Sequence, residues 1–307
     1  MHIKILSLIL FTFFSILSGE ESFTEFSGDY FGETPPGETP KILAHNLLAN
    51  SINISFSPDG KEFFFVKDMD SNNTGDIHWM KRINDRWMKP IAAPFNSLYI
   101  DNDICLSNNG KKAYFRSWRP IDGMTEEESS SHIWYSQKIN DKWSDPHLVK
   151  YVDGFLRAGY PSISKNGKLY FPKKTNRINN YGELFYLELE NGKDFTEKIA
   201  LYNDPLNEYN EGDMCVSPDE SFVITSCWQR PDTSSGGESD LYISFNLGNG
   251  EWSRLINMGK EINSDLIENC PTISHDSKYF FFNRYDGKNC DAYWVSTSII
   301  KKLRELL

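Results

Sequence analysis

The hydrophobic and polar positions of this chain follow one long pattern that occurs five times. In each copy a short alternating segment ends at a serine, a polar turn follows, and then comes a run of aromatic and β-branched residues. The five serines are Ser57, Ser107, Ser164, Ser217 and Ser274, at intervals of 50, 57, 53 and 57 residues. Such a period is that of one propeller blade or kelch-type unit. The pattern predicts a β-unit repeated around a common axis.

Each unit divides into four predicted strands. In the first unit these are INISFS (52–57), EFFFVKD (62–68), DIHWMKR (76–82) and WMKPIAA (87–93). Proline and glycine in the PDG turn suit a tight reversal, and aromatic residues favour a pleated, buried surface. Asn-Asp and Asn-Gly pairs predict the hairpin before the fourth strand. The tryptophans that follow three of these hairpins, Trp87, Trp143 and Trp252, are expected to pack between adjacent blades.

The fifth unit has no fourth strand, because an amphipathic helix, SIIKKLRELL, soon follows its third strand. The segment 39–50, TPKILAHNLLAN, matches the fourth strands in character and is predicted to complete the last blade. Such closure removes an exposed sheet edge. We therefore expect an all-β, five-bladed β-propeller with a short C-terminal helix. Six blades are the alternative, which would need a cryptic sixth unit.

The repeat SPDGK followed by an aromatic strand resembles the PD40 or WD40-like propeller repeats of the TolB C-terminal domain and of many exported bacterial proteins. The second, third and fifth units carry SNNG, SKNG and SHDS instead of SPDG. The resemblance covers nearly the whole mature chain. It implies a propeller fold and a protein-interaction module without catalysis.

The N-terminal residues predict export. Lys4 precedes an apolar run of 13 residues from Ile5 to Leu17, which is too short for a spanning helix of about 20 residues but fits a signal peptide. We expect a signal peptide at 1–19, an extension at 20–38, one propeller domain at 39–307, and a periplasmic or extracellular location. An uncleaved N-terminal anchor is the alternative; after cleavage no membrane span is expected.

The net charge is −11, and −12 once the signal segment with Lys4 is removed. Such a surface repels nucleic-acid phosphates, so no nucleic-acid partner is expected. Five cysteines, Cys105, Cys215, Cys227, Cys270 and Cys290, fit no zinc or redox pattern. A bridge between Cys270 and Cys290 stays open. Glycine-rich phosphate loops and HExxH are absent from the sequence, and no cofactor is predicted.

Polar residues at the start of the innermost strands predict a ligand site at one mouth of the central channel. The acidic residues there are Asp101, Asp103, Glu211, Asp213 and Glu268. Residues after the second strands are expected at the same face: Arg116, Arg119, Arg230, Arg284, Trp118, Trp228 and Tyr285. Carboxylates that share a mouth need a cation or a proton. The set suits a glycan or peptide ligand, or else forms structural ion pairs between blades.

Two chemical alternatives remain. Asp103, Glu211 and Glu268 could supply the acid and base of a carbohydrate-active enzyme, a glycoside hydrolase or lyase, since carboxylate pairs cleave glycosidic bonds. In the loop DMDSNNTGD, Asp68, Asp70, Asn72 and Asp76 have alternating spacing that suggests calcium, although the EF-hand glycine and glutamate are missing. The favoured prediction is an exported, non-catalytic module that binds a protein or glycan partner. The sequence leaves the oligomeric state open.

Overall fold

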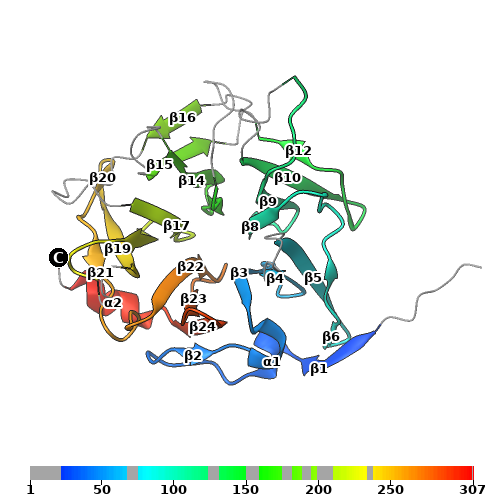
Figure 1. The fold of residues 1–307 in the computed structure, drawn as a ribbon, viewed down its shortest axis with the longest axis horizontal. Coiled ribbons are helices and arrows are strands. Elements are labelled where there is room, and N and C mark those ends of the chain that lie inside the picture. The colour runs from blue at the N-terminus through cyan, green and yellow to red at the C-terminus, as the bar shows by residue number, and fades with distance from the viewer. Residues whose placement is uncertain are drawn as a thin grey trace, which may run out of the picture.

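The computed structural model describes residues 22–67, 75–123, 131–149, 159–174, 182–188, 195–198, 210–233, 238–305 and 307. Five antiparallel sheets stand in a ring around a central axis (Figure 1). The predicted five-bladed propeller is therefore confirmed. Among these residues, no helix has the length and apolar character required to cross a membrane.

Each blade is a meander whose first strand lies next to the axis. Blade 1 consists of β3 (Ser51–Phe56), β4 (Glu62–Lys67), β5 (Asp76–Ile83), β6 (Arg86–Met88) and β7 (Ile91–Ala92). Blade 2 consists of β8 (Asp101–Leu106), β9 (Lys112–Ser117), β10 (His132–Ile139), β11 (Lys142–Trp143) and β12 (His147–Leu148). Blade 3 consists of β13 (Ser162–Ile163), β14 (Lys168–Lys174), β15 (Gly182–Glu188) and β16 (Phe195–Lys198). Blade 4 consists of β17 (Asn210–Val216), β18 (Phe222–Trp228), β19 (Ser239–Gly248), β20 (Glu251–Trp252) and β21 (Ile256–Asn257). Blade 5 has β22 (Ile267–Ile273), β23 (Tyr279–Tyr285) and β24 (Cys290–Ser296).

The N-terminal part of the chain closes the ring, as predicted. β2 (Lys41–Ile42) pairs with β24 as the fourth strand of blade 5, and the amide of Leu43 donates to the carbonyl of Ala292 at 2.8 Å. A short helix α1 (His45–Leu48) then leads into β3. β1 (Phe23–Ser27) pairs with β6 and adds an outer strand to blade 1. The last sheet thus combines strands from the N-terminal and C-terminal parts of the chain, and β2 covers the outer edge of β24.

The repeated serine has a structural role in the turn between the first two strands. The hydroxyl of Ser57 accepts a hydrogen bond from the amide of Glu62 at 2.8 Å and donates to Asp59 at 2.6 Å. Equivalent bonds to the amide five residues later occur at Ser107, Ser217 and Ser274. The position three after each serine has a positive φ angle, filled by Gly60, Gly110 and Gly167 but by Glu220 and Ser277 in blades 4 and 5. Glycine adopts this angle without steric cost, which explains the SPDG and NNG sequences.

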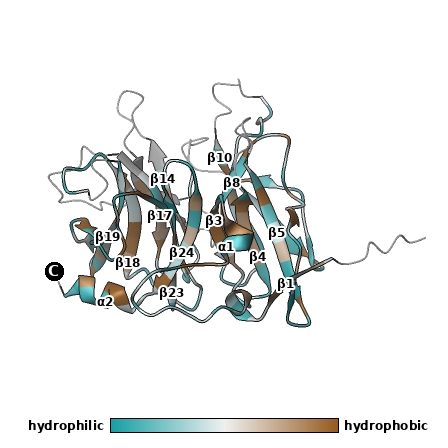
Figure 2. Cartoon of the chain, turned by 60° about the horizontal axis from the view of Figure 1, so that its bottom comes forward, coloured by the Kyte–Doolittle hydropathy of each residue, from teal (hydrophilic) through white to brown (hydrophobic). Residues whose placement is uncertain are grey.

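Apolar side chains fill the spaces between blades, and the strands are hydrophobic on their packed faces (Figure 2). Trp143 of blade 2 packs edge-on against Phe64 of blade 1, with ring centroids 5.9 Å apart. Between blades 1 and 5 lies the 3-10 turn η1 (Asp29–Gly32), whose Phe31 contacts Phe56, Phe63 and Trp87. The predicted packing of Trp87 and Trp143 in blade interfaces is therefore present.

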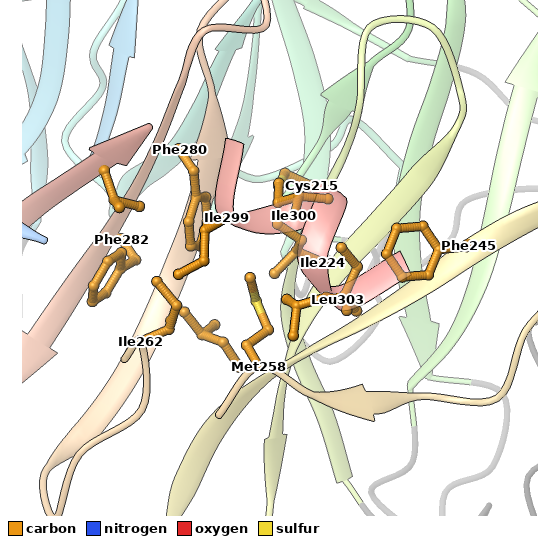
Figure 3. Packing of buried hydrophobic residues seen from close by; sticks show 13 residues of the cluster. Cys215, Ile224, Phe245, Met258, Ile262, Phe280, Phe282, Ile299, Ile300 and Leu303 are labelled. Carbon is orange, nitrogen blue, oxygen red and sulfur yellow. The ribbon is translucent and has the colours of Figure 1, made fainter. Parts of the chain in front are cut away.

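The C-terminal helix α2 (Ser298–Arg304) covers blades 4 and 5 from outside. Its Ile299, Ile300 and Leu303 are at most 9% exposed and join a cluster with Ile243 and Phe280 (Figure 3). Burying side chains of this size stabilises the fold by roughly 1.5–3 kcal/mol each. The helix therefore packs against both of the last two blades and stabilises their contact.

Candidate functional site

One residue from each blade, in its inner strand or, for Tyr160, two residues before it, contributes to a ring at the axis. Each stands four positions before the serine of its blade: Asn53, Asp103, Tyr160, Asp213 and Cys270. In blades 1, 2, 4 and 5 the pairing with the second strand shifts register here, which marks a β-bulge. A bulge interrupts the alternation of side chains between the two faces of a strand and so points one side chain in a new direction. Four ring residues line a central cavity of about 50 Å³, namely Asn53, Tyr160, Asp213 and Cys270.

The ring side chains link each blade to the next. The Oδ1 atom of Asn53 accepts from the amide of Ile104 at 2.6 Å. Asp213 Oδ2 accepts from the backbone amide of Cys270 at 2.8 Å, and the Cys270 thiol donates to the same oxygen at 3.1 Å. Asp103 Oδ2 lies 3.4 Å from the amide nitrogen of Tyr160. The ring therefore helps to hold the propeller closed.

The two ring carboxyls lie in an environment that disfavours charge. Asp103 is 1% exposed and Asp213 is 7% exposed. Burial raises the pKa of Asp103 to about 7; the Arg116 guanidinium lowers it, and the nearby Asp213 raises it further. Burial also raises the pKa of Asp213, against hydrogen bonds from Cys270 and Tyr160. Both ring carboxyls therefore ionise less readily than an exposed aspartate.

Arg116 lies across the mouth above this ring. Its Nη1 atom is 3.5 Å from Asp103 Oδ2, and its guanidinium stacks on the Trp118 ring at 4.1 Å. Gly159 of the next blade makes room for it, because a Cβ atom there would lie only 3.0 Å from the Arg116 Cδ atom. Stacking of arginine on an aromatic ring positions a planar donor group.

Several polar atoms around this mouth are buried but have no hydrogen-bond partner among the described residues. They are Ser51 Oγ, Asn102 Oδ1, Asp103 Oδ1, Arg116 Nε and Asn269 Oδ1. All except the arginine lie in the first residues of inner strands. Further buried atoms of this kind lie elsewhere in the described residues, among them the indole nitrogens of Trp134, Trp143 and Trp294. A buried polar group without a partner costs about 1–3 kcal/mol, so the atoms at the mouth are groups that solvent or a ligand can complete.

Asp101 lies two residues from the ring but in a different environment. It is fully buried, and its Oδ1 atom accepts from Arg119 Nη2 at 2.8 Å. Its Oδ2 atom accepts from the Ser97 amide at 2.5 Å and from the Ser97 hydroxyl at 2.8 Å. The Arg119 guanidinium also donates to the carbonyl of Phe95 at 3.0 Å. We call Ser97, Asp101 and Arg119 the blade 2 clamp.

Blade 5 repeats this arrangement. Glu268 is fully buried, and its Oε1 atom accepts from the Ser264 hydroxyl at 2.6 Å and from Arg284 Nε at 2.7 Å. Arg284 Nη2 donates to the carbonyl of Ile262 at 2.8 Å. Burial raises the pKa of Glu268, while the bonds from Ser264 and Arg284 act in the opposite direction. We call Ser264, Glu268 and Arg284 the blade 5 clamp.

The other predicted site residues are spread over this face. Trp228 ends β18 beside Gly212, where a Cβ atom would lie 3.1 Å from the Trp228 Nε1 atom. Arg230 is 4% exposed, pairs with Asp232 at 3.2 Å and lies over the Tyr242 ring. Tyr285 ends β23, where it pairs with Ile267. The side chain of Glu211 lies outside the described residues.

Metal and thiol chemistry have little support in the described residues. These residues contain no cluster of three or more His, Cys, Asp or Glu side chains that could hold a metal ion. Asp68, Asp70 and Asn72 of the suggested calcium loop lie outside the described residues, and Asp76 begins β5. None of the five cysteines, all of which lie in the described residues, forms a disulfide, so the possible bridge between Cys270 and Cys290 is not formed.

Sequence reasoning missed the serines of the two clamps. The signal was present as a repeated phrase, FNSLYID at 95–101 and INSDLIE at 262–268. In both, Asn-Ser precedes the acidic residue at the same spacing. The loop before blade 4 reads PLNEYNE instead and has no serine at that position.

Comparison with protein-family models finds no match, and a search of curated proteins finds none. Among solved structures, the chain is similar to a protein assigned as TolB from Agrobacterium tumefaciens, with a TM-score of 0.51 and 14% identity over 78% of this chain and 71% of that chain. It is also similar to TolB from Acinetobacter baumannii, with a TM-score of 0.49 and 10% identity over 80% of this chain and 53% of that one. The tricorn protease gives a TM-score of 0.47 and 12% identity over 78% of this chain and 25% of that one.

These similarities concern the fold. The chain spans about half the length of the Acinetobacter protein and a quarter of the protease chain. Identity of 14% to the Agrobacterium protein supports a common architecture and leaves activity to be argued from the site itself. The chain is a five-bladed β-propeller whose structural neighbours include TolB and other propeller proteins.

Proposed function

We propose that this protein is an exported, non-catalytic binding module that holds a segment of a partner protein at the mouth around Arg116 and Trp118. The observation that carries the proposal is the group of buried, unpartnered polar atoms at this mouth. A peptide offers amide donors and carbonyl acceptors that can complete them, with Trp118 as an apolar wall. The TolB-like propeller fold is consistent with a protein-binding role.

The carboxyl groups favour binding over catalysis. A general acid or base must reach a substrate atom within hydrogen-bond distance. Both oxygens of Glu268 are engaged by Ser264, with Arg284 on Oε1, and the residue has no exposed surface. Asp103 is also buried and lies within the ring that joins blades 2 and 3. These carboxylates therefore stabilise contacts within and between blades and fix the shape of the mouth.

Export is supported by the N-terminal sequence, in which Lys4 precedes the apolar run Ile5–Leu17. Cell fractionation of the full chain, with N-terminal sequencing of the product, tests this part. Cleavage near residue 19 and recovery outside the cytoplasm are expected, and a product in the cytoplasm that retains Met1 would contradict it.

Partner binding is tested by photo-crosslinking in the source cells. A photoreactive phenylalanine analogue at position 118 is expected to yield an adduct with a discrete partner protein, identified by mass spectrometry. The matched control carries the analogue at Leu247, which is 55% exposed on the opposite face. Adding Arg116→Ala to the position 118 variant is expected to abolish the adduct.

Two results would contradict the proposal. One is equal labelling from positions 118 and 247. The other is turnover in a glycan hydrolysis screen that is lost in Glu211→Gln or Glu268→Gln while circular dichroism shows an intact fold. The second result would establish a carbohydrate-active enzyme, and adducts with glycan alone would establish a glycan-binding module.

A further inference from the structure

We propose that the loops 95–101 and 262–268 form a twin-loop docking surface for a partner segment that is cationic and carries large apolar side chains. The inference rests on the proposed function and names the chemistry of the partner. Both loops lead into inner strands, β8 and β22, and therefore lie at the same mouth (Figure 1). Leu98, Tyr99 and Leu266 are the contacts offered to the partner.

These three side chains expose apolar surface beside the mouth. Leu98 is 99% exposed, Tyr99 is 48% exposed and Leu266 is 37% exposed. Tyr99 and Leu266 occupy the same position, two residues before the buried acid of each clamp. Single exposed apolar residues are common on protein surfaces. Here the same type of residue is exposed at the same place in two structurally repeated loops, next to the proposed site.

Hydrogen bonds hold the backbone of both loops from which these side chains project. In each loop the serine hydroxyl accepts a hydrogen bond from the amide of the residue two places later, Tyr99 at 3.1 Å and Leu266 at 3.2 Å. The preceding asparagine bonds to the third strand of the previous blade: Asn96 donates to Ile77 O at 2.9 Å, and Asn263 donates to Leu241 O at 3.0 Å. A loop backbone that is already ordered loses little conformational entropy on binding, which favours apolar residues on such loops as anchors.

The clamps explain why acids are buried in these loops. Replacing a buried ion pair by apolar residues is often neutral or stabilising, so stability alone is a weak reason to keep one. In both clamps the carboxylate accepts bonds from the loop serine and from an arginine of the second strand. The arginine then reaches the carbonyl at the loop start. The result is a defined loop shape that leaves its apolar residues outside.

The exposed charged residues on this face are mostly acidic and therefore favour a cationic partner. The arginines of both clamps are at most 17% exposed at the side chain and paired with acids. The exposed charged residues in the described parts of these loops and of the second-to-third strand connections are Asp122, Asp232, Glu238, Asp265, Asp286 and Lys288, with Lys67 at the end of β4. The acidic excess matches the net charge of −11. Complementary charge steers a basic segment to the mouth.

The test uses a phage-displayed library of random dodecapeptides panned against the mature protein. Enriched peptides are expected to combine lysine or arginine with leucine, phenylalanine or tryptophan. Synthetic copies are then titrated by fluorescence anisotropy. The triple variant Leu98→Ser, Tyr99→Ser, Leu266→Ser is expected to weaken binding by about tenfold or more, and added salt is expected to weaken it further.

The matched control is the double variant Ile139→Ser, Leu247→Ser. These residues are 56% and 55% exposed in hairpins on the opposite face, and their loss is expected to leave binding unchanged. Acidic enriched peptides, equal affinity for the triple variant, or no enrichment would overturn the inference. The inference would also be overturned if the wild type and the control variant were dimers and the triple variant a monomer. The loops would then bind a second copy of this chain.

The outcome separates this inference from the proposed function. If peptides bind the triple variant normally but lose affinity for Arg116→Ala, the mouth is the binding site and the two loops do not contribute to it. Loss of binding in the triple variant, together with equal photo-labelling from positions 118 and 247, would keep the docking surface and reject the mouth as a partner site.

Discussion

Two pairs of buried carboxyl groups lie close together in this propeller and have opposite surroundings. Asp101 and Glu268 each accept bonds from an arginine and a serine of their own blade. Asp103 and Asp213 point to the axis, where Arg116 is the nearby cation and lies 3.5 Å from Asp103. Only one residue separates Asp101 from Asp103, yet one carboxyl has a strong ion pair and the other a raised pKa.

The difference follows from the direction of the side chains. At the bulge in β8, Asp103 adopts a φ angle of 54°, whereas Asp101 pairs regularly with Ser117 at the end of β9. The Asp101 side chain therefore meets Arg119, which follows β9, while Asp103 meets the next blade and the axis. The clamp carboxyls thus meet a serine and an arginine, whereas the ring carboxyls meet backbone amides of the next blade, with Arg116 beside Asp103.

The largest expected effect comes from removing the cation of a clamp. Arg284→Met leaves the Glu268 carboxylate buried without its guanidinium and is expected to lower the free energy of unfolding by about 3–5 kcal/mol. Urea denaturation at neutral pH measures the change. Arg119→Met is expected to behave alike, because Asp101 is equally buried.

The control for this prediction is Lys302→Met, which removes a surface ion pair with Glu38. Exposed pairs contribute little, so no measurable change is expected. If Arg284→Met destabilised the protein no more than Lys302→Met, the clamps would not be strong ion pairs and the contrast with the ring would disappear.

The second effect is a pH dependence that belongs to the ring. The pKa of Asp103 is about 7 in the folded protein, above the value of 3.8 for the free side chain. Between these values the folded state holds a proton that the unfolded state has lost, so stability falls as the pH rises through this window. Asp103→Asn lacks this titration. The variant is expected to gain roughly 2–4 kcal/mol relative to wild type between about pH 4 and about pH 8.

Urea denaturation of both proteins across this range gives the difference, in which most other titrating groups cancel. Leu247→Ser, which removes no titrating group, is the control and is expected to give a flat difference. A flat difference for Asp103→Asn as well would contradict the raised pKa of the ring carboxyl.

The smallest effect comes from the clamp hydroxyls. Ser97→Ala and Ser264→Ala each remove one hydrogen bond to a buried carboxylate and are expected to cost about 1–2 kcal/mol. Ser51→Ala is the matched control, because its hydroxyl is buried without a partner among the described residues and its loss should be neutral or stabilising. Equal costs at all three serines, measured by thermal unfolding, would contradict the clamp geometry.

Much of the fold was predictable from local sequence. The spacing of the five serines predicted five blades, and Ser57 and its equivalents do hold the first turn of their blades. Closure by the segment 39–50 was also predicted, since its apolar pattern matched the missing strand. These features depend on turns and strand periodicity, which neighbouring residues determine.

The candidate site was predictable only as a group of residues. The sequence placed Asp101, Asp103 and Glu268 at one mouth, and in the structure each lies near the start of an inner strand, β8 or β22, beside the axis. It did not separate the clamp acids from the ring acids. That distinction depends on a β-bulge and on the positions of Arg116, which lies in β9, and of Arg119, which follows β9.

The sequence by itself determined the number of blades, the turn chemistry and the closing strand, because each follows from residues a few positions apart or from a repeated pattern. Only the tertiary structure decided which carboxyl groups are neutralised and which face the axis. The physical reason is that burial and counter-charge are set by side chains from other strands and blades, such as Arg284 beside Glu268 and Cys270 beside Asp213. Their positions exist only once the ring is closed.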